Sequence, residues 1–167
     1  MERKNAWKGA DLGALETFAA QYREFLNQGK TERECVELCV RAAGLAGFMN
    51  LSACTAENRR LKPGDRVYAN WMGKAFLMFI IGSQELSHGM NILGAHIDSP
   101  RIDVKQNPLY EEADLAYLDT HYYGGIKKYQ WVATPLAIHG VVVKKNGDTI
   151  ALSVGENEND PVFCISD

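Results

Sequence analysis

The sequence predicts a mixed α/β fold, and three observations lead to this prediction. Apolar residues recur at helical spacing in the first part of the chain, which indicates amphipathic helices. Short apolar runs bounded by glycine, proline and asparagine follow, as is typical of strands. The run that leads to His96 is apolar at nearly every position, which favours a strand buried on both faces within a mixed or parallel sheet.

The first predicted helix covers the sequence DLGALETFAAQYREFLNQG. Its apolar residues include Leu15, Phe18 and Tyr22, which are three and four positions apart and therefore share one face. Gly29 provides the stop signal, because glycine is favoured just beyond the last turn of a helix. We expect this helix to bury its apolar stripe against a larger element, such as a sheet.

A second helix follows almost at once. Thr31 and Glu34 have the spacing of a capping box, in which each side chain bonds the other residue's backbone N–H. We expect Gly44 and Gly47 to end this helix. Its predicted apolar stripe consists of Cys35, Leu38, Cys39 and Ala42. This stripe should pack against the same sheet as the first helix.

Three strands are predicted in the next part of the chain. Residues 63–65 (Pro-Gly-Asp) form a turn signal before a first strand at 66–71. The sequence NWMGKA predicts a second turn, and residues 75–81 form an apolar run long enough for a buried strand. Residues 91–97 are the third predicted strand, the one that lacks alternation.

The sequence changes character after Pro100. Residues 101–131 are rich in tyrosine and show no clear periodicity, so we expect a long functional or mobile loop. A β-hairpin should follow around Asn146 and Gly147, because Asn-Gly between apolar runs is a strong hairpin signal. The chain closes on the apolar residues 161–163, from which we expect its last residue to fall inside a larger fold.

Composition excludes several classes of protein. The net charge is -3 and no basic block is present, so the sequence predicts no nucleic-acid partner. No apolar run reaches the roughly 18 residues of a membrane span, and the N-terminus lacks the apolar region of a secretory signal. The four cysteines are dispersed, which is typical of reduced thiols in a cytoplasmic protein. Cys35 and Cys39 would need two further ligands to hold zinc, and the sequence shows none nearby.

His96 and Asp98 are the candidate site residues. Residues two apart on a strand face the same side, so Asp98 can accept a hydrogen bond from one imidazole nitrogen and leave the other for a metal ion. Alternatively, Asp98 or Ser99 caps a turn, and Pro100 simply ends a strand. The residues alone leave both interpretations open.

Several segments together resemble a known protein family. The sequences GAHIDSPRIDVKQNP, YYGGI and PLAIHGVVVK, with the closing DPVFCISD, look like the aspartyl aminopeptidase family of zinc metallopeptidases. The resemblance runs in order along nearly the whole chain, and its most specific part is Gly-Ala-His-x-Asp-Ser-Pro. It implies that residues 1–100 are the N-terminal part of an α/β/α catalytic domain. Residues 101–167 would then begin an inserted, mainly β domain used in oligomerisation.

The resemblance also implies an activity. Members of the family are hydrolases that remove single N-terminal residues from peptides with two zinc ions. His96 would be a zinc ligand, and Asp98 would be the catalytic carboxylate that orients it. Such enzymes form homo-oligomers, and their remaining zinc ligands and general base would lie beyond residue 167. The 167 residues alone should therefore bind zinc weakly and hydrolyse nothing.

Two features depart from the family pattern. Tyr129 stands where many members have a substrate-binding histidine, and Ala133-Thr134 stand where they have an acidic residue and arginine. These differences leave the preferred N-terminal residue of the substrate open. Two other hypotheses also remain, namely a non-catalytic fragment that acts as a pairing or oligomerisation module, and a different metallohydrolase with the same His-x-Asp motif.

Overall fold

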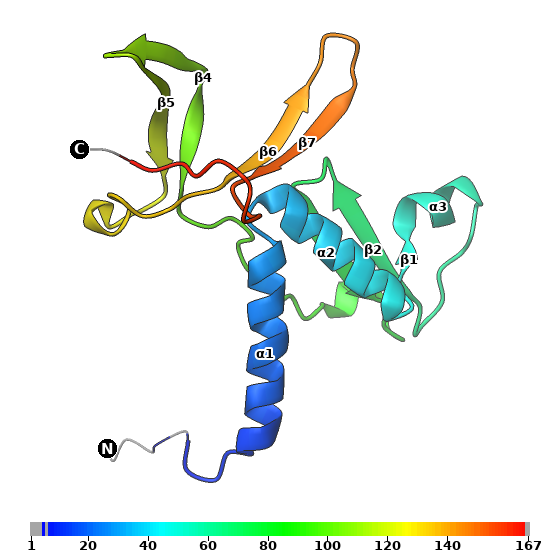
Figure 1. Ribbon diagram of the computed structural model, residues 1–167. Helices are drawn as coiled ribbons and strands as arrows, with labels where there is room; N and C mark the ends of the chain where they lie inside the picture. Colours follow the sequence, from blue (N-terminus) through cyan, green and yellow to red (C-terminus); the bar gives the residue numbers. More distant parts are fainter. Residues whose placement is uncertain (1–4, 6, 166–167) are drawn as a thin grey trace. The chain divides into compact units, whose positions relative to one another are not determined.

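The computed structural model of the chain describes residue 5 and residues 7–165, arranged in two compact units (Figure 1). The division falls between Ile97 and Asp98. The assignment of residues 1–100 and 101–167 to a catalytic and an inserted domain stays a prediction. So does the absence of a secretory signal, which falls partly on residues 1–4 and 6, outside the described residues. No helix in the described part is long and apolar enough to span a membrane.

Both predicted helices are present in the first unit. Helix α1 (Leu12–Gln28) begins after Asp11, whose side chain accepts a hydrogen bond from the Ala14 N–H at 3.1 Å. Gly29 caps its C-terminus, as predicted. Helix α2 (Glu32–Leu45) begins with the predicted capping box, in which the Thr31 N–H donates to Glu34 Oε2 at 2.8 Å. Local sequence signals therefore fix the starts of both helices.

A small three-stranded sheet accompanies these helices. Strand β2 (Arg66–Trp71) pairs in parallel with the short β1 (Met49–Asn50) and antiparallel with β3 (Ala75–Ile80). Helix α3 (Leu51–Ala56) follows β1 directly. Residues 72–74 join β2 to β3; Met72 and Gly73 have φ angles of 56° and 66°, and the Lys74 N–H donates to the Trp71 carbonyl oxygen at 3.0 Å. The prediction of strands at 66–71 and 75–81 is thus confirmed, although β3 ends at Ile80.

The core of the first unit lies between α2, α3 and this sheet. Its buried side chains are Cys35, Val36, Ala43, Cys54 and Val67. The expectation that α1 also buries its stripe is wrong for the described structure, because α1 has no buried residue and Phe18 is 70% exposed. Strand β3 was expected to be buried, but most of its apolar side chains are exposed. Helices α2 and α3 pack against this sheet, in which β3 is an edge strand, and so small a layer does not bury every apolar side chain of that strand.

Residues 91–97 do not form the predicted strand. They contain no helix or strand, and Ile92 and Leu93 are 78% and 101% exposed. The physical reason is that a strand requires a neighbour for its backbone N–H and C=O groups. The strands in the described part of the chain pair with one another and none pairs with this segment. An apolar sequence is therefore not sufficient to make a strand here.

The second unit begins with a long hairpin where we expected a loop. Strand β4 (Arg101–Glu112) pairs antiparallel with β5 (Leu115–Tyr123) through a turn at Ala113-Asp114, where both φ angles are positive. The register shifts within the hairpin, so that residues 105–108 of β4 lie opposite Asp119 alone. This bulge interrupts the period-two pattern by which strands are recognised, and it explains why the loop prediction is wrong.

The predicted hairpin around Asn146 and Gly147 is confirmed. Strands β6 (Ile138–Val143) and β7 (Thr149–Val154) pair antiparallel, and the connecting turn is closed by a 2.8 Å hydrogen bond from the Lys144 N–H to the Asp148 carbonyl. Two short 3₁₀ helices, η1 (Leu86–His88) and η2 (Lys128–Gln130), lie in the connections before β4 and before β6. The segment from η1 to β4 carries the candidate site.

Candidate metal site

The two candidate residues lie at the division between the units. His96 is exposed and belongs to the last part of the first unit, and Asp98 is half-buried and opens the second unit. Both belong to a stretch without helix or strand that ends where β4 begins at Arg101. The prediction that His96 binds a metal and Asp98 orients it assumed that both residues lie on one face of a strand. Because this segment is not a strand, that geometry does not apply, and the two roles stay predictions.

The side chains of His96 and Asp98 could supply only part of a zinc site. Catalytic zinc is usually held by about three protein ligands. Within the described ranges, no group of three or more histidine, cysteine, aspartate or glutamate side chains is placed to hold a metal ion. His96 has the right chemistry for one zinc bond, and Asp98 for the orientation of a ligand. No hydrolytic step follows from these two residues by themselves.

The start of β4 contains polar contacts that sequence reasoning did not find. Arg101 Nε donates to Asp103 Oδ1 at 2.6 Å, and Nη2 of the same guanidinium lies 3.4 Å from Oδ2. The guanidinium carbon also lies 4.1 Å from the centre of the Tyr123 ring, on the paired strand. Arg101 and Asp103 are two residues apart and would share one face of a strand, so their pairing could have been predicted from the sequence. The position of Tyr123 opposite Arg101 could not, because a loop was expected in place of the two paired strands.

Other histidines have local roles. His139 lies on β6, and its Nε2 is 2.8 Å from Glu156 Oε1, with a side chain only 13% exposed. His139 is thus a structural residue of this strand, with Glu156 as its partner. His121 was expected in a loop but lies on β5, where its Nδ1 is 3.3 Å from the Tyr122 carbonyl oxygen. Neither residue lies in a described donor cluster of three or more.

The cysteine pair on α2 does not resemble a zinc site. Burial raises the pKa of the Cys35 thiol, and the neighbouring Cys39 and Glu34 raise it further. Burial likewise raises the pKa of Cys39. Within the described residues, no further donor joins Cys35 and Cys39 to make up the four ligands of a structural zinc site. The Cys35 thiol instead lies 3.6 Å from the Gly29 carbonyl oxygen, to which it can donate, and so packs against the end of α1.

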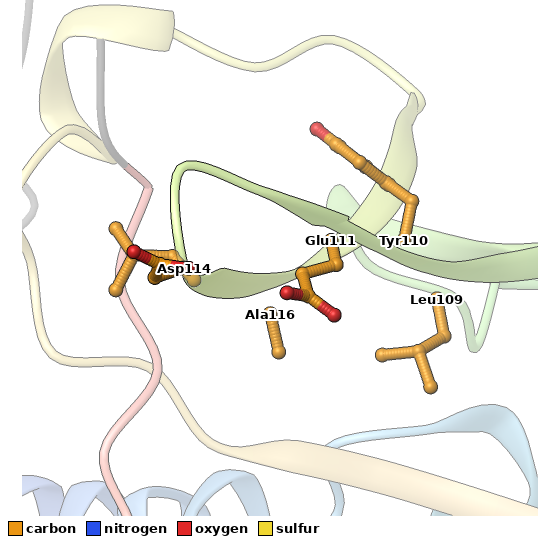
Figure 2. Close-up of a pocket in the computed structure, with 6 residues that line it drawn as sticks. Leu109, Tyr110, Glu111, Asp114 and Ala116 are labelled. Atoms are coloured by element: carbon orange, nitrogen blue, oxygen red, sulfur yellow. The ribbon is translucent and has the colours of Figure 1, made fainter.

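A shallow pocket of about 390 Å³ lies at the tip of the first hairpin of the second unit (Figure 2). Leu109, Glu111 and Ala116 project to one side of the ribbon, while Tyr110 projects to the other, where it stacks on Tyr117. The pocket contains two carboxylates and no histidine or cysteine. Its chemistry does not match a zinc site, and the candidate residues are not among its lining residues.

Comparison with protein families gives a match over most of the chain. Residues 25–167 match the sequence model of the family described as aminopeptidase I zinc metalloprotease (M18). A protein from Clostridium acetobutylicum, named probable M18 family aminopeptidase 1, is 56% identical over 169 residues. That alignment covers 99% of this chain but 36% of the relative. The chain thus spans little more than a third of the length of this curated relative.

Solved structures give the same result. The crystal structure of an M18 family aminopeptidase from Thermotoga maritima superposes on this chain with a TM-score of 0.89 at 43% identity. The matched region covers 100% of this chain and 36% of that protein. Aminopeptidase I from Clostridium acetobutylicum superposes with a TM-score of 0.84 at 51% identity, with coverage of 100% and 37%. These matches confirm the predicted mixed α/β fold and its place at the N-terminal part of such proteins.

Proposed function

The chain belongs to the aminopeptidase I (M18) family of zinc metalloproteases, and from this premise we propose that it forms the N-terminal part of a zinc-dependent aminopeptidase. Such a hydrolase removes single N-terminal residues from peptides. The observation that carries the proposal is the family match over residues 25–167, together with high identity to a protein named as an aminopeptidase. The zinc dependence follows from the description of the family.

Within this proposal, His96 supplies one bond to zinc and Asp98 orients the imidazole. A carboxylate that accepts a hydrogen bond from the second ring nitrogen fixes the tautomer and makes the ligand more basic. Two zinc ions are proposed for the complete protein, with the remaining ligands and the general base outside these 167 residues. The described residues support no more than this partial contribution, because they contain no complete donor cluster.

The proposal is tested on the full-length protein. His96→Ala should abolish release of the N-terminal residue from an unblocked peptide and lower the zinc content measured by mass spectrometry. The reason is the loss of one of about three protein ligands. His88→Ala is a matched control, because His88 is exposed in η1 and is assigned no metal role. Normal turnover and a full zinc complement in the His96→Ala protein would show that the assignment is wrong.

Peptide substrates, a homo-oligomeric assembly and a cytoplasmic location complete the proposal. All four cysteines are unpaired thiols, which supports a reducing compartment. The preferred N-terminal residue of the substrate remains open, because Tyr129 and Ala133-Thr134 depart from the pattern of the family.

A second candidate function is a non-catalytic pairing or oligomerisation module. The exposed apolar side chains Leu109 and Leu115, near the tip of the β4–β5 hairpin, favour a surface that contacts another protein. Size-exclusion chromatography combined with metal analysis separates the two functions. A module would assemble equally well after zinc is removed with a chelator, whereas a zinc enzyme would lose its activity.

A further inference from the structure

We propose that Arg101 is a positioning residue for the metal site, because its contacts with Asp103 and Tyr123 hold the chain that leads from Asp98 into β4. The inference rests on the proposed function of Asp98 as the orienting carboxylate. It concerns residues of the second unit alone, since Asp98 and all three members of this cluster lie after Ile97. We call Arg101, Asp103 and Tyr123 the β4 anchor.

The first contact in the β4 anchor is the ion pair. The Arg101 guanidinium presents two nitrogens to the two carboxylate oxygens of Asp103, at 2.6 and 3.4 Å. The two side chains are only 26% and 30% exposed, so water screens the pair less than it screens a surface pair. Two-point contact between a planar guanidinium and a carboxylate restricts orientation as well as distance. Arg101 therefore has a defined position at the first residue of β4.

The second contact is with the opposite strand. Arg101 and Tyr123 are direct partners in the antiparallel register, and the guanidinium lies over the tyrosine ring at 4.1 Å. A cation over the face of an aromatic ring is attracted by its quadrupole. This contact ties the first residue of β4 to the last residue of β5. The base of the hairpin is consequently closed by a side-chain contact in addition to the backbone pairing.

The residues that flank the β4 anchor also lie close together. A Cβ atom added at Gly124 would lie 3.6 Å from the Cα of Pro100, so the backbone after β5 packs against the residue before Arg101. Gly124 has a φ of 71°, a conformation that favours glycine. Pro100 has its own φ restrained by its ring. Only Ser99 then separates this restrained residue from Asp98.

These contacts bear on metal affinity for a geometric reason. An orienting carboxylate is useful only when it is held close to its productive position, and loosening the residues that support it weakens the site. Asp98 is three residues from Arg101, and the chain between them contains no helix or strand. The β4 anchor therefore supplies a fixed point on the C-terminal side of Asp98.

The same hairpin provides a matched control. Lys105 Nζ lies 2.9 Å from Asp119 Oδ2, which is also an ion pair between β4 and β5. It lies at the bulge, and its side chains are 48% and 49% exposed. Removing this pair perturbs the hairpin without touching its base. A general loss of hairpin stability and a specific loss at the β4 anchor can thus be separated.

The test uses the full-length zinc-loaded protein with three substitutions. Arg101→Met removes both contacts at similar length, and Arg101→Lys keeps the charge but loses the planar two-point geometry. Lys105→Met removes the control pair. The readouts are zinc affinity by competition with a chelator, kcat and KM for an unblocked peptide, and the thermal melting temperature. These readouts distinguish an effect on the metal from an effect on the fold.

Arg101→Met should weaken zinc affinity by about tenfold, the lower end of the range for residues that support metal ligands. In the same variant we expect kcat to fall while KM stays nearly unchanged. Arg101→Lys should lose less zinc affinity and less kcat than Arg101→Met. Lys105→Met should keep normal zinc affinity. Unchanged zinc affinity in Arg101→Met would overturn the proposal, as would an equal loss in Lys105→Met. If Arg101→Met does not fold, Arg101→Lys decides, and normal zinc affinity in that variant would overturn the proposal.

Asp98→Asn, measured in parallel, separates this inference from the proposed function. Normal zinc affinity and normal turnover in Asp98→Asn would show that the proposed role of Asp98 is wrong, and the role of Arg101 would be wrong with it. Weakened zinc affinity in Asp98→Asn beside normal affinity in Arg101→Met would reject the positioning role of Arg101 alone.

Discussion

At the scale of single residues, Asp160 shows how one carboxylate can order a loop. Its Oδ2 accepts hydrogen bonds from the Gly155 and Asn157 N–H groups at 3.0 and 3.1 Å, and from the Asn157 side-chain amide at 3.0 Å. Backbone donation from Asn157 and Gly155 lowers the pKa of Asp160 below its ordinary value of 3.8. The ionised form is favoured because N–H donors can bond only to an acceptor. The acidic sequence GENEND is therefore a structured turn.

We predict that this turn opens in acid. A carboxyl whose pKa is lowered by folding contributes stability above its unfolded pKa, and this contribution is lost as the pH falls through the folded pKa. The amide chemical shifts of Gly155 and Asn157 should titrate with a midpoint below 3.8. Asp160→Asn should remove that titration. A midpoint at or above the ordinary value would contradict the prediction.

The residues of the candidate site differ in how far they could be predicted. His96 and Asp98 follow from a short motif, and their roles stay predictions because no described donor cluster tests them. Arg101 and Tyr123 could not be paired from the sequence, because opposite positions in a hairpin depend on the register. Here the register includes a bulge, which period-two reasoning does not supply.

At the scale of elements, local signals succeed where the element is stabilised by its own residues. The capping box at Thr31 and the glycine after α1 place helix ends correctly, because caps satisfy backbone groups within a few residues. Residues 91–97 show the opposite case. Their apolar character indicates burial, but a strand also needs a partner that the local sequence does not contain.

The cap of α2 gives an element-scale prediction. Thr31→Ala should lower the free energy of unfolding by about 1 kcal/mol, because it removes the side-chain acceptor for the Glu34 N–H and leaves that donor without its cap. Denaturant unfolding followed by circular dichroism measures the change. Thr17→Ala is the control, since the Thr17 hydroxyl bonds the Gly13 carbonyl within exposed α1 and its removal should change little. Equal losses in the two variants would argue against a capping role.

At the scale of the whole molecule, the 167 residues form their secondary structure but supply only part of the candidate metal site. The chain superposes closely on solved family members, yet it covers 36% of the protein from Thermotoga maritima. The helices, the β2–β3 pair and the second hairpin form within the 167 residues. The donor set of a zinc site does not form within the described part of them. These helices and hairpins are formed by residues that are near one another in the sequence, whereas a metal site collects ligands from distant parts of a sequence.

This difference predicts weak metal binding by the 167 residues alone. Isothermal titration with Zn²⁺ should give an affinity at least about tenfold below that of the full-length protein, because about three protein ligands are needed for a catalytic zinc. The chain should also release no amino acid from an unblocked peptide. His96→Ala should abolish most of the remaining affinity. A full-length affinity in the isolated chain would show that it contains further ligands.

The bulge in β4 has a consequence for solubility. It divides the ladder into two runs of four residue pairs, from Arg101 to Val104 and from Leu109 to Glu112. A long, flat strand edge can recruit the strand of another molecule and start edge-to-edge aggregation. An incoming strand would find a regular edge of only about four residues before reaching the bulge, which increases the local twist. The bulge that prevents prediction of this hairpin from the sequence thus also makes the edges of the hairpin poor templates for fibre growth.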